Sequence, residues 1–496
     1  MLSQKVFTGY FGKLIALFIN LVGGMIVARL VGPSELGKVA FALSFISIFT
    51  FLCDFGTGTV HLTIIPQKEN YSDYLGTFVF LKILFIILFS VFSFASLIIF
   101  KNTIFHNLSS DYYIISLITL ISVIFSQLNE IANSHFIAKT EQAKQEVIRI
   151  SSSGINQFLR LTFSAVGFKA IGLSIAYMFS LFFTIPLSIK WLVKEKIGIF
   201  QLKKAKEYLI LGLPILFISI FSTGTEYLDK VIIQFYASSY ELGLYSFSQN
   251  ISSMIKMGIQ SAGLLFIPTF SFCLVKNNYD DIFGIIKKFE KFIVFIAMPL
   301  LFSFFHLSNE ICLILGGKKF YDAGPVMGFL ILSILIFGLN HPFDNLLAAQ
   351  KRFTTVAVIA FFRNGFFLLL LFASIKYISI QPSLIASICI LITNIIFGFF
   401  SRFIVYKSLQ RRNKLYLFFG KEFFVIQLIF MLSLCISFIL TLIYHSLFSR
   451  IVGLFSFLIL VLPYLFVKKK LFLTDTILVF KNILPNKLIK YIKSEL

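Results

Sequence analysis

The chain of 496 residues is too apolar for a water-soluble protein, because 58% of its residues are hydrophobic and only 13% are charged. Soluble domains carry about 25% charged residues. Apolar windows of about 20 residues follow one another along the chain, and each is long enough for a helix to cross ~30 Å of hydrocarbon. The composition therefore predicts an all-α, polytopic membrane protein. The net charge of +22 must then be explained within a membrane protein.

About fourteen spans are expected in chain order. The first apolar run carries Lys13 and Arg29 and lacks a small-residue cleavage site, so we interpret it as a retained span rather than a signal peptide. The spans are predicted near residues 10–31, 39–60, 76–100, 112–136, 148–168, 170–192, 208–236, 244–271, 286–307, 322–344, 354–376, 380–406, 421–444 and 450–467. We expect four parts: a six-helix bundle at 1–195, a second at 207–415, two extra helices at 416–467 and a tail at 468–496.

The basic residues indicate the orientation of these spans. With the N-terminus inside, roughly 30 Lys and Arg fall in cytoplasmic segments and roughly 8 in outer turns, as the positive-inside rule expects. Both termini are then cytoplasmic and the protein lies in the inner (plasma) membrane. Nucleic-acid binding is the less favoured explanation of the charge, because the clusters sit in short loops against an anionic leaflet. The basic tail 468–496 is interpreted as an interfacial amphipathic anchor, with a docking role as the alternative.

Motifs for catalysis, metals or cofactors are missing from the sequence. The five cysteines lie apart without the spacing of a disulfide framework or a zinc site, and the six histidines form no His-x-x-x-His pair. Gly316-Gly-Lys-Lys is not a phosphate-binding loop, because the first Gly and the final Ser or Thr are absent. We expect no metal, no cofactor and no enzyme activity. A membrane polymerase or ligase remains an alternative, but the longest predicted outer connection is only about a dozen residues.

A polar corner interrupts the apolar runs at RLVGPSELGKVAF, Arg29 to Phe41. Its Glu35-Leu-Gly37 and Phe41 recur 206 residues later as Glu241-Leu-Gly243 and Phe247. The predicted spans between the copies are even in number, so the copies lie on the same side and the two halves run parallel. Chance is the alternative explanation of so short a match. If the repeat is real, the corner is a tight outer turn between the first two helices of each half.

Three stretches resemble the polysaccharide (O-antigen) lipid-carrier flippases of the MOP exporter superfamily, which also contains MATE exporters and lipid II flippases. They are R-L-V-G-P-S-E-L-G at the corner, Tyr227–Tyr236 with the following E-L-G-L-Y, and Leu315–Ala323. Leu36 departs from the aromatic residue usual before the Gly. The resemblance implies two six-helix bundles plus two helices, and export of a polyprenyl-diphosphate-linked glycan by alternating access. It also makes a polysaccharide polymerase a candidate partner.

Cations and amides line up on the predicted spans. Charges inside spans are costly and are expected to face an interior cavity or one another. The fifth span carries a polar face of Arg149, Ser153, Asn156, Arg160 and Ser164, and the eighth carries Gln249, Ser253, Lys256 and Gln260. We predict that the substrate-binding residues, which would attract a diphosphate, are Lys13, Arg149, Asn156, Arg160, Lys256 and Arg363. Helix–helix contacts and snorkelling span ends are the alternatives.

Four acidic residues lie within predicted spans and are candidates for coupling to a proton or sodium ion: Asp54, Glu130, Glu226 and Asp229. Glu226 and Lys230 stand four residues apart on one helix face, so a structural salt bridge is the alternative there. A MATE-like small-molecule exporter is the rival within transport. It would be expected to stop near twelve helices and to carry fewer intramembrane cations.

Overall fold

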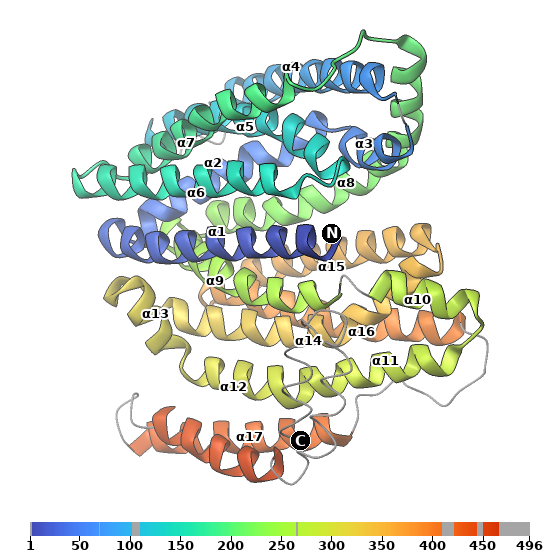
Figure 1. The fold of residues 1–496 in the computed structure, drawn as a ribbon. Helices are drawn as coiled ribbons and strands as arrows, with labels where there is room; N and C mark the ends of the chain where they lie inside the picture. The colour runs from blue at the N-terminus through green and yellow to red at the C-terminus, as the bar shows by residue number, and fades with distance from the viewer. Residues whose placement is uncertain are drawn as a thin grey trace. The chain divides into compact units, whose positions relative to one another are not determined.

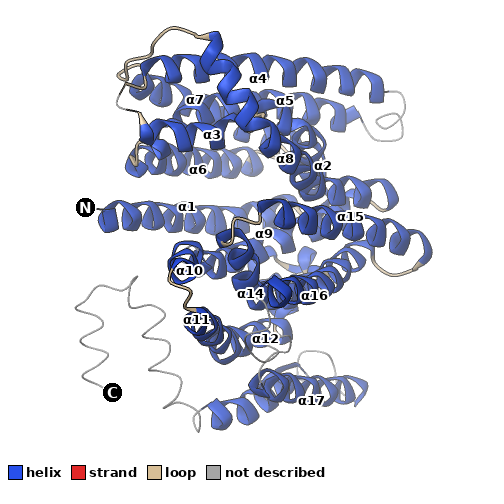
Figure 2. Cartoon of the chain, turned by 90° about the vertical axis from the view of Figure 1, so that its right-hand side faces the viewer, coloured by secondary structure: helices blue, strands red, loops and turns tan. Residues whose placement is uncertain are grey.

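The computed structural model describes residues 2–68, 70–101, 110–263, 266–408, 421–443 and 450–465. Within these residues the chain forms helices joined by short connections, and no strand occurs in them (Figure 2). Eight helices of the described part are long and apolar enough to cross a membrane, and shorter apolar helices accompany them. The predicted all-α polytopic membrane protein is confirmed. The tail 468–496 lies outside the described residues.

Two compact units make up the chain. The first comprises Met1–Phe247, Leu313–Phe320 and Asn364–Ala386, and the second comprises Ser248–Cys312, Tyr321–Arg363 and Ser387–Leu496. The four-part domain division expected from the sequence stays a prediction.

The first unit begins with a series of helices, most of them 23 residues or longer (Figure 1). They are α1 (Leu2–Val31), α2 (Pro33–Ser47), α3 (Thr57–Ile64), α4 (Ser72–Lys101), α5 (Ser110–Ala138), α6 (Gln142–Ala165), α7 (Ala170–Leu192) and α8 (Leu202–Tyr236). Helix α1 packs along α6, α7 packs against α5 and α6, and α8 packs against α2 and α3. Aromatic side chains from α4, α5 and α8, including Phe78, Phe136 and Tyr208, fill a core that also takes in α3. Much of α4 and α7 remains apolar and exposed, as lipid-facing surface requires.

The second predicted span is broken, not continuous. Helix α2 tightens to a 3-10 segment at Ile48–Cys53, and α3 restarts at Thr57. Between them Phe55 and Gly56 have positive φ angles of 47° and 73°, a region that favours glycine. A Cβ on Gly56 would lie 2.5 Å from the carbonyl oxygen of Gly212 in α8. The break therefore lets two backbones meet, and it leaves Asp54 at the start of α3, where its Oδ1 accepts the Gly58 N–H at 2.9 Å.

The second unit contains most of the remaining helices. Helices α9 (Ser239–Gly263), α13 (Ser308–Gly316), α15 (Phe353–Tyr377) and α16 (Pro382–Ser408) each contribute residues to both units. Lying wholly in the second unit are α10 (Phe266–Val275), α11 (Tyr279–Phe292), α12 (Met298–His306), α14 (Ala323–Ala349), α17 (Lys421–Ile443) and the helix Arg450–Leu465. Helix α14 packs against α10 and α12, and α12 packs against α17. Helix α13 occupies part of what the sequence predicts to be an outer turn.

Candidate functional site

The polar face predicted on the fifth span lies on α6 and packs against α1. Asn20 of α1 donates from Nδ2 to Ser153 Oγ at 3.3 Å and accepts from Gln157 Nε2 at 3.0 Å. Glycines on α1 allow the close approach, because a Cβ on Gly23 would lie 2.7 Å from Gln157 Oε1. The Oδ1 atom of Asn156 is buried without a hydrogen-bond partner in the described structure. Amide groups from both helices thus form one polar seam.

The cations along this seam differ in how they are paired. Arg149 Nη1 lies 3.0 Å from Oε1 of the buried Glu146, and Lys13 contributes positive charge at the same carboxylate. Arg160 stands farther along α6 and is half-buried. Among the residues that the structure describes, Arg160 has no hydrogen bond or acidic partner. A half-buried guanidinium without a protein anion has its donors available for an anionic ligand.

Two further predicted cations lie in the second unit. Lys256 Nζ lies 4.6 Å from the ring centroid of Phe337. Arg363 and Ser401 both lie near the carboxylate of Asp344. Lys256 and Arg363 therefore each lie beside a side chain of the protein. The role of these two cations in substrate binding stays a prediction.

The structure buries the side chain of Arg402 within the second unit. Its Nη2 lies 2.8 Å from Glu290 Oε1 and 2.8 Å from the Leu339 carbonyl oxygen, and its Nε donates to Asn340 Oδ1 at 2.9 Å. The guanidinium also lies 4.3 Å from the ring centroid of Phe343. Glu290 and Asn340 come from α11 and α14, and neither is near Arg402 in sequence. Arg402 therefore joins three helices of its own unit.

The acidic candidates occupy different environments. Asp54 forms an ion pair with Lys82 of α4, a side chain that is 2% exposed. Glu130 accepts from Ser134 Oγ, one turn along α5, at 3.1 Å. Asp229 is 2% exposed and accepts from Tyr245 Oη at 2.7 Å. The sequence did not anticipate that partner, because Tyr245 comes from the next helix.

The salt bridge considered between Glu226 and Lys230 is not formed. Lys230 Nζ donates to the backbone oxygen of Glu226 at 2.9 Å and lies 3.8 Å from Asp229 Oδ1. The Glu226 side chain is exposed, and no ion pair with it occurs in the described part of the chain. Lys230 turns toward the buried carboxylate of Asp229 instead, so these two groups form the charged pair of α8.

The two copies of the Glu-Leu-Gly motif meet in the first unit. A Cβ on Gly37 would lie 1.8 Å from the carbonyl oxygen of Ser239, and a Cβ on Gly243 would lie 1.9 Å from that of Pro33. Ser239 follows Pro33 by the repeat offset of 206 residues, as Gly243 follows Gly37. The first turns of α2 and α9 therefore cross in a reciprocal, two-fold-like contact that only glycine permits.

The glutamates of the motif have equivalent partners as well. Glu35 Oε2 accepts from the backbone N–H of Ala170, the first residue of α7, at 3.0 Å. Glu241 Oε2 accepts from the backbone N–H of Ser383 at 3.3 Å and from its hydroxyl at 2.6 Å, in the first turn of α16. Each carboxylate thus binds the N-terminus of the last helix of its predicted half. These contacts support the parallel repeat inferred from the sequence.

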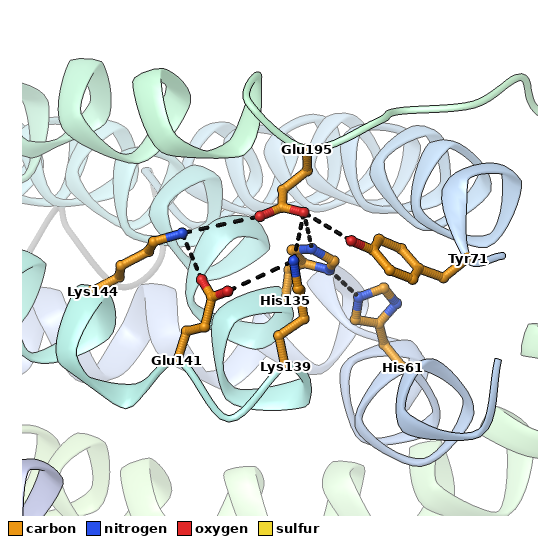
Figure 3. A network of polar contacts seen from close by, with 7 residues as sticks. All are labelled: His61, Tyr71, His135, Lys139, Glu141, Lys144 and Glu195. Atoms are coloured by element: carbon orange, nitrogen blue, oxygen red, sulfur yellow. Dashed lines mark hydrogen bonds and ion pairs between the residues drawn. The ribbon is translucent and has the colours of Figure 1, made fainter. Parts of the chain in front are cut away.

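A second network lies at the predicted cytoplasmic end of the first unit (Figure 3). Two buried imidazoles are joined by a contact of 3.2 Å between His61 Nε2 and His135 Nδ1. His61 Nδ1 lies 2.8 Å from Tyr208 Oη, and His135 Nε2 lies 3.8 Å from Glu195 Oε2. Sequence analysis missed this cluster because the histidines are 74 residues apart. The one available signal was that both lie at the predicted inner ends of spans.

Glu195 links the histidines to a group of lysines. Its Oε2 accepts from Lys139 Nζ at 2.7 Å and from Tyr71 Oη at 2.9 Å, while Lys144 and Glu141 extend the charged group. Burial by itself would raise the pKa of Glu195, but the hydrogen bonds from Lys139 and Tyr71 outweigh it and hold the pKa below its ordinary value. Burial by itself would lower the pKa of Lys139, and the same contacts raise it overall.

Comparison with known proteins identifies the family. A model of the polysaccharide biosynthesis protein family matches residues 26–325, more than half of the chain. The chain belongs to the polysaccharide biosynthesis protein family. This result confirms the family resemblance carried by the corner, the Tyr227–Tyr236 stretch and the Leu315–Ala323 stretch. A search of the curated proteins finds no match.

This polysaccharide biosynthesis protein shares its fold with solved transporters of the MOP superfamily. The lipid II flippase MurJ, in an inward closed conformation, aligns with a TM-score of 0.68 at 17% identity, covering 94% of this chain and 99% of that chain. A multidrug resistance MATE family transporter in an inward-facing conformation aligns at 0.65 and 14% identity, covering 80% and 96%. A MOP superfamily transporter from Pyrococcus furiosus aligns at 0.57 and 13% identity, covering 82% and 96%. The likeness establishes the fold of a multi-pass membrane protein.

Proposed function

We propose that this polysaccharide biosynthesis protein is a flippase, not an enzyme, that moves a polyprenyl-diphosphate-linked oligosaccharide across the inner membrane by alternating access. Family membership supplies the polysaccharide context, and MurJ, with a similar fold, is a lipid II flippase. Both termini lie on the cytoplasmic side, where the basic loops meet anionic lipids. A polysaccharide polymerase receiving the glycan on the far side is the expected partner.

The observation that carries the proposal is the seam between α1 and α6. Among the residues that the structure describes, Arg160 offers a guanidinium without a protein anion, and Asn156 offers a buried amide oxygen without a partner. A diphosphate presents several acceptor oxygens for a planar guanidinium fork, and sugar hydroxyls donate to amide oxygens. Arg149 and Lys13 add positive potential beside Glu146. Lys256 and Arg363, which belong to the second unit, remain predicted substrate-binding residues.

Transport is coupled to a proton or sodium ion in this proposal. Asp54 and Asp229 are the stronger candidates among the four acidic residues, because each pairs with a lysine inside a predicted span. A carboxylate in such a position binds or releases a cation when its lysine partner moves away. Glu130 and Glu226 remain candidates, although neither pairs with a lysine among the described residues.

A second candidate function is MATE-like export of small molecules, which the MATE likeness favours. The two functions differ in the ligand. A flippase requires a lipid carrier with a diphosphate, whereas a drug exporter acts on a free solute.

The test is reconstitution into liposomes with a fluorescent polyprenyl-diphosphate oligosaccharide, whose protection from an external quencher reports translocation. The wild type is expected to translocate the probe. Arg160→Ala abolishes the signal, and Arg160→Lys restores part of it, because lysine keeps the charge and loses the bidentate fork. The matched control is Lys169→Ala, an exposed cation at the start of α7, which leaves the rate unchanged. Full activity of Arg160→Ala removes the seam from the substrate path, and translocation of free drugs alone favours the exporter.

A further inference from the structure

The donors and acceptors of the two buried histidines of Figure 3 depend on their tautomers, and the charge of Glu195 favours one order. The Glu195 carboxylate accepts from Lys139 and Tyr71, and its Oε2 lies 3.8 Å from His135 Nε2, so its negative charge favours a proton on that nitrogen. A neutral His135 therefore carries its proton on Nε2 and presents a bare Nδ1 to His61. His61 must then donate from Nε2, and its bare Nδ1 accepts the hydroxyl proton of Tyr208. One carboxylate thus sets the direction of the whole chain, from Tyr208 toward Glu195.

One extra proton reverses that direction. When the proton lies between Glu195 and His135 Nε2, His135 donates from Nδ1, His61 accepts at Nε2 and donates from Nδ1, and Tyr208 becomes the acceptor. The atoms balance through a simple relay. A proton taken up by the Tyr208 hydroxyl pushes the original hydroxyl proton to His61, the His61 Nε2 proton to His135, and the His135 Nε2 proton to Glu195. The loaded state therefore holds one more proton than the unloaded one, and both rings stay neutral.

The site is built to hold protons rather than only to pack. His61, His135 and Tyr208 are each 0% exposed, whereas the Glu195 side chain is 10% exposed and Lys139 is 24% exposed. The relay thus runs from the buried Tyr208 of α8 to a group that water can reach. His61 also stacks on Phe78 at 3.9 Å between ring centroids, which fixes the orientation of its ring.

Charged and titratable groups face the histidines from every neighbouring element. From α4 comes Lys82, paired with Asp54. Near the predicted inner ends of α5 and α6 lie Lys139, Glu141 and Lys144. Near the starts of α4 and α8 lie Tyr71, Tyr74 and Glu207. Lys82 therefore acts on His61 and Lys139 on His135, while Glu195 Oε2 lies 3.8 Å from His135 Nε2. In this conformation the lysines favour the ionised, proton-free form.

Glu195 also holds the connection between α7 and α8. That connection lies on α4, since Gly198 N donates to the Ser72 carbonyl at 2.8 Å and Gln201 N donates to Thr77 Oγ1 at 3.1 Å. Neutralising Glu195 weakens its contact with Lys139, and moving the connection away from Lys139 raises the proton affinity of Glu195. Proton binding to Glu195 is then linked to movement of the α7–α8 connection away from Lys139. Each favours the other by the same free energy.

We propose that His61, His135 and Glu195, with Tyr208 as the inner end, form a proton-binding site that couples proton uptake to movement of the connection leading into α8. The coupling role rests on the proposed flippase function. The proton-binding role does not, because it follows from the four side chains alone. The ligand is a proton, and the site is distinct from the aspartates considered above.

The first experiment tests proton binding without transport. The whole protein, with 15N-labelled histidine, is titrated in lipid nanodiscs, and the nitrogen shifts report which ring nitrogen carries the proton. Both rings are expected to be protonated on Nε2 at high pH and to change together at one midpoint on acidification. Lys139→Gln raises that midpoint, Glu195→Gln abolishes the joint change, and Lys196→Gln, an exposed neighbour, leaves it in place. Separate midpoints, or a His135 proton on Nδ1 at high pH, overturn the proposal.

The second experiment tests coupling in the liposome assay described above, with and without an imposed pH gradient. A gradient is expected to accelerate wild-type translocation, and His135→Gln and Glu195→Gln are expected to lose that acceleration while retaining gradient-free exchange. The matched control is His306→Gln, because His306 is also buried and contacts Ser433 at 3.0 Å in the second unit. Persistent acceleration in both variants overturns the coupling role. A wild type that moves no probe instead refutes the flippase function, and the titration still decides the proton site.

Discussion

The two ends of the first unit are held together by different physics. At the predicted outer end, α2 and α9 meet backbone to backbone through Gly37 and Gly243. At the predicted cytoplasmic end, histidines, lysines and Glu195 meet through charges and protons. A steric contact is made or lost as a whole, whereas a titratable contact responds to pH and to neighbouring charge. The cytoplasmic end is therefore the end at which pH and neighbouring charge shift the conformational equilibrium.

The largest expected effect is all-or-none and tests whether these ends lie on opposite sides of the membrane. A cysteine at Ser34 is expected to react with an impermeant reagent added outside intact cells. A cysteine at Lys196 is expected to react only when the reagent reaches the cytoplasm. The background protein carries Cys435→Ser, because Cys435 is the exposed one of the five free cysteines. Labelling of both positions from one side contradicts the fourteen-span orientation.

The outer contact breaks when either glycine gains a side chain. Gly37→Ala or Gly243→Ala places a Cβ less than 2 Å from a backbone oxygen, and relieving such an overlap costs about 1–3 kcal/mol. Both variants are expected to melt at lower temperature in detergent and to translocate the probe more slowly. Gly365→Ala is the control, since nothing lies within 4 Å of its Cβ. If both glycine variants melt at the wild-type temperature, the close approach of α2 and α9 does not contribute to stability.

Glu35 and Glu241 test whether the two copies of the repeat are equivalent, because equivalent copies predict equal losses of stability. Glu35→Gln and Glu241→Gln each remove a negative charge from a helix N-terminus, which stabilises such an end by about 1 kcal/mol. Chemical denaturation of the two single variants is expected to give similar losses. Their double variant is expected to show additive losses, because the two carboxylates bind different helices. A loss confined to one variant argues against the functional equivalence of the two copies.

The smallest expected effect is the pH dependence of the cytoplasmic end. Glu195 has a folded-state pKa below its ordinary value of 4.5, so its stabilisation is present above that pH and is lost as the pH falls through the folded-state value. Relative to wild type, Glu195→Gln is therefore less stable by about 1 kcal/mol at pH 7. The difference disappears in acid. Thermal melts across pH measure it, and a constant difference at every pH removes ionisation of Glu195 as the cause.

The sequence predicted where the helices lie better than it predicted which side chains contact one another. Helix length and hydropathy located the spans, because a helix needs about 20 apolar residues to cross the bilayer. The break at Phe55 and Gly56 was missed, since its cause is a contact with Gly212, far along the chain. Helical spacing found the α6 face correctly as a polar surface, yet it gave no sign that Arg149 pairs with Glu146 while Arg160 lacks an acidic partner among the described residues.

Partner choice depends on packing between helices, which a single sequence does not encode locally. Lys230 was matched with Glu226 by helical spacing, but it turns toward Asp229. His61 and His135 carry no shared motif, and they meet only because α3 and α5 pack together. The Glu-Leu-Gly repeat is the exception. Sequence similarity alone found the two copies, although the contact between them appeared only in the structure.

The length of α8 has a consequence for the lipids around the protein. Its 35 residues extend over about 52 Å at about 1.5 Å per residue, well beyond ~30 Å of hydrocarbon. The first turns of α8, with Lys203, Lys204 and Lys206, therefore reach the headgroup layer. Tyr208 follows directly, so bilayer thickness and anionic lipid content act on the helix that carries one end of the histidine relay. Thin and thick bilayers should give the same protein different translocation rates at the same pH.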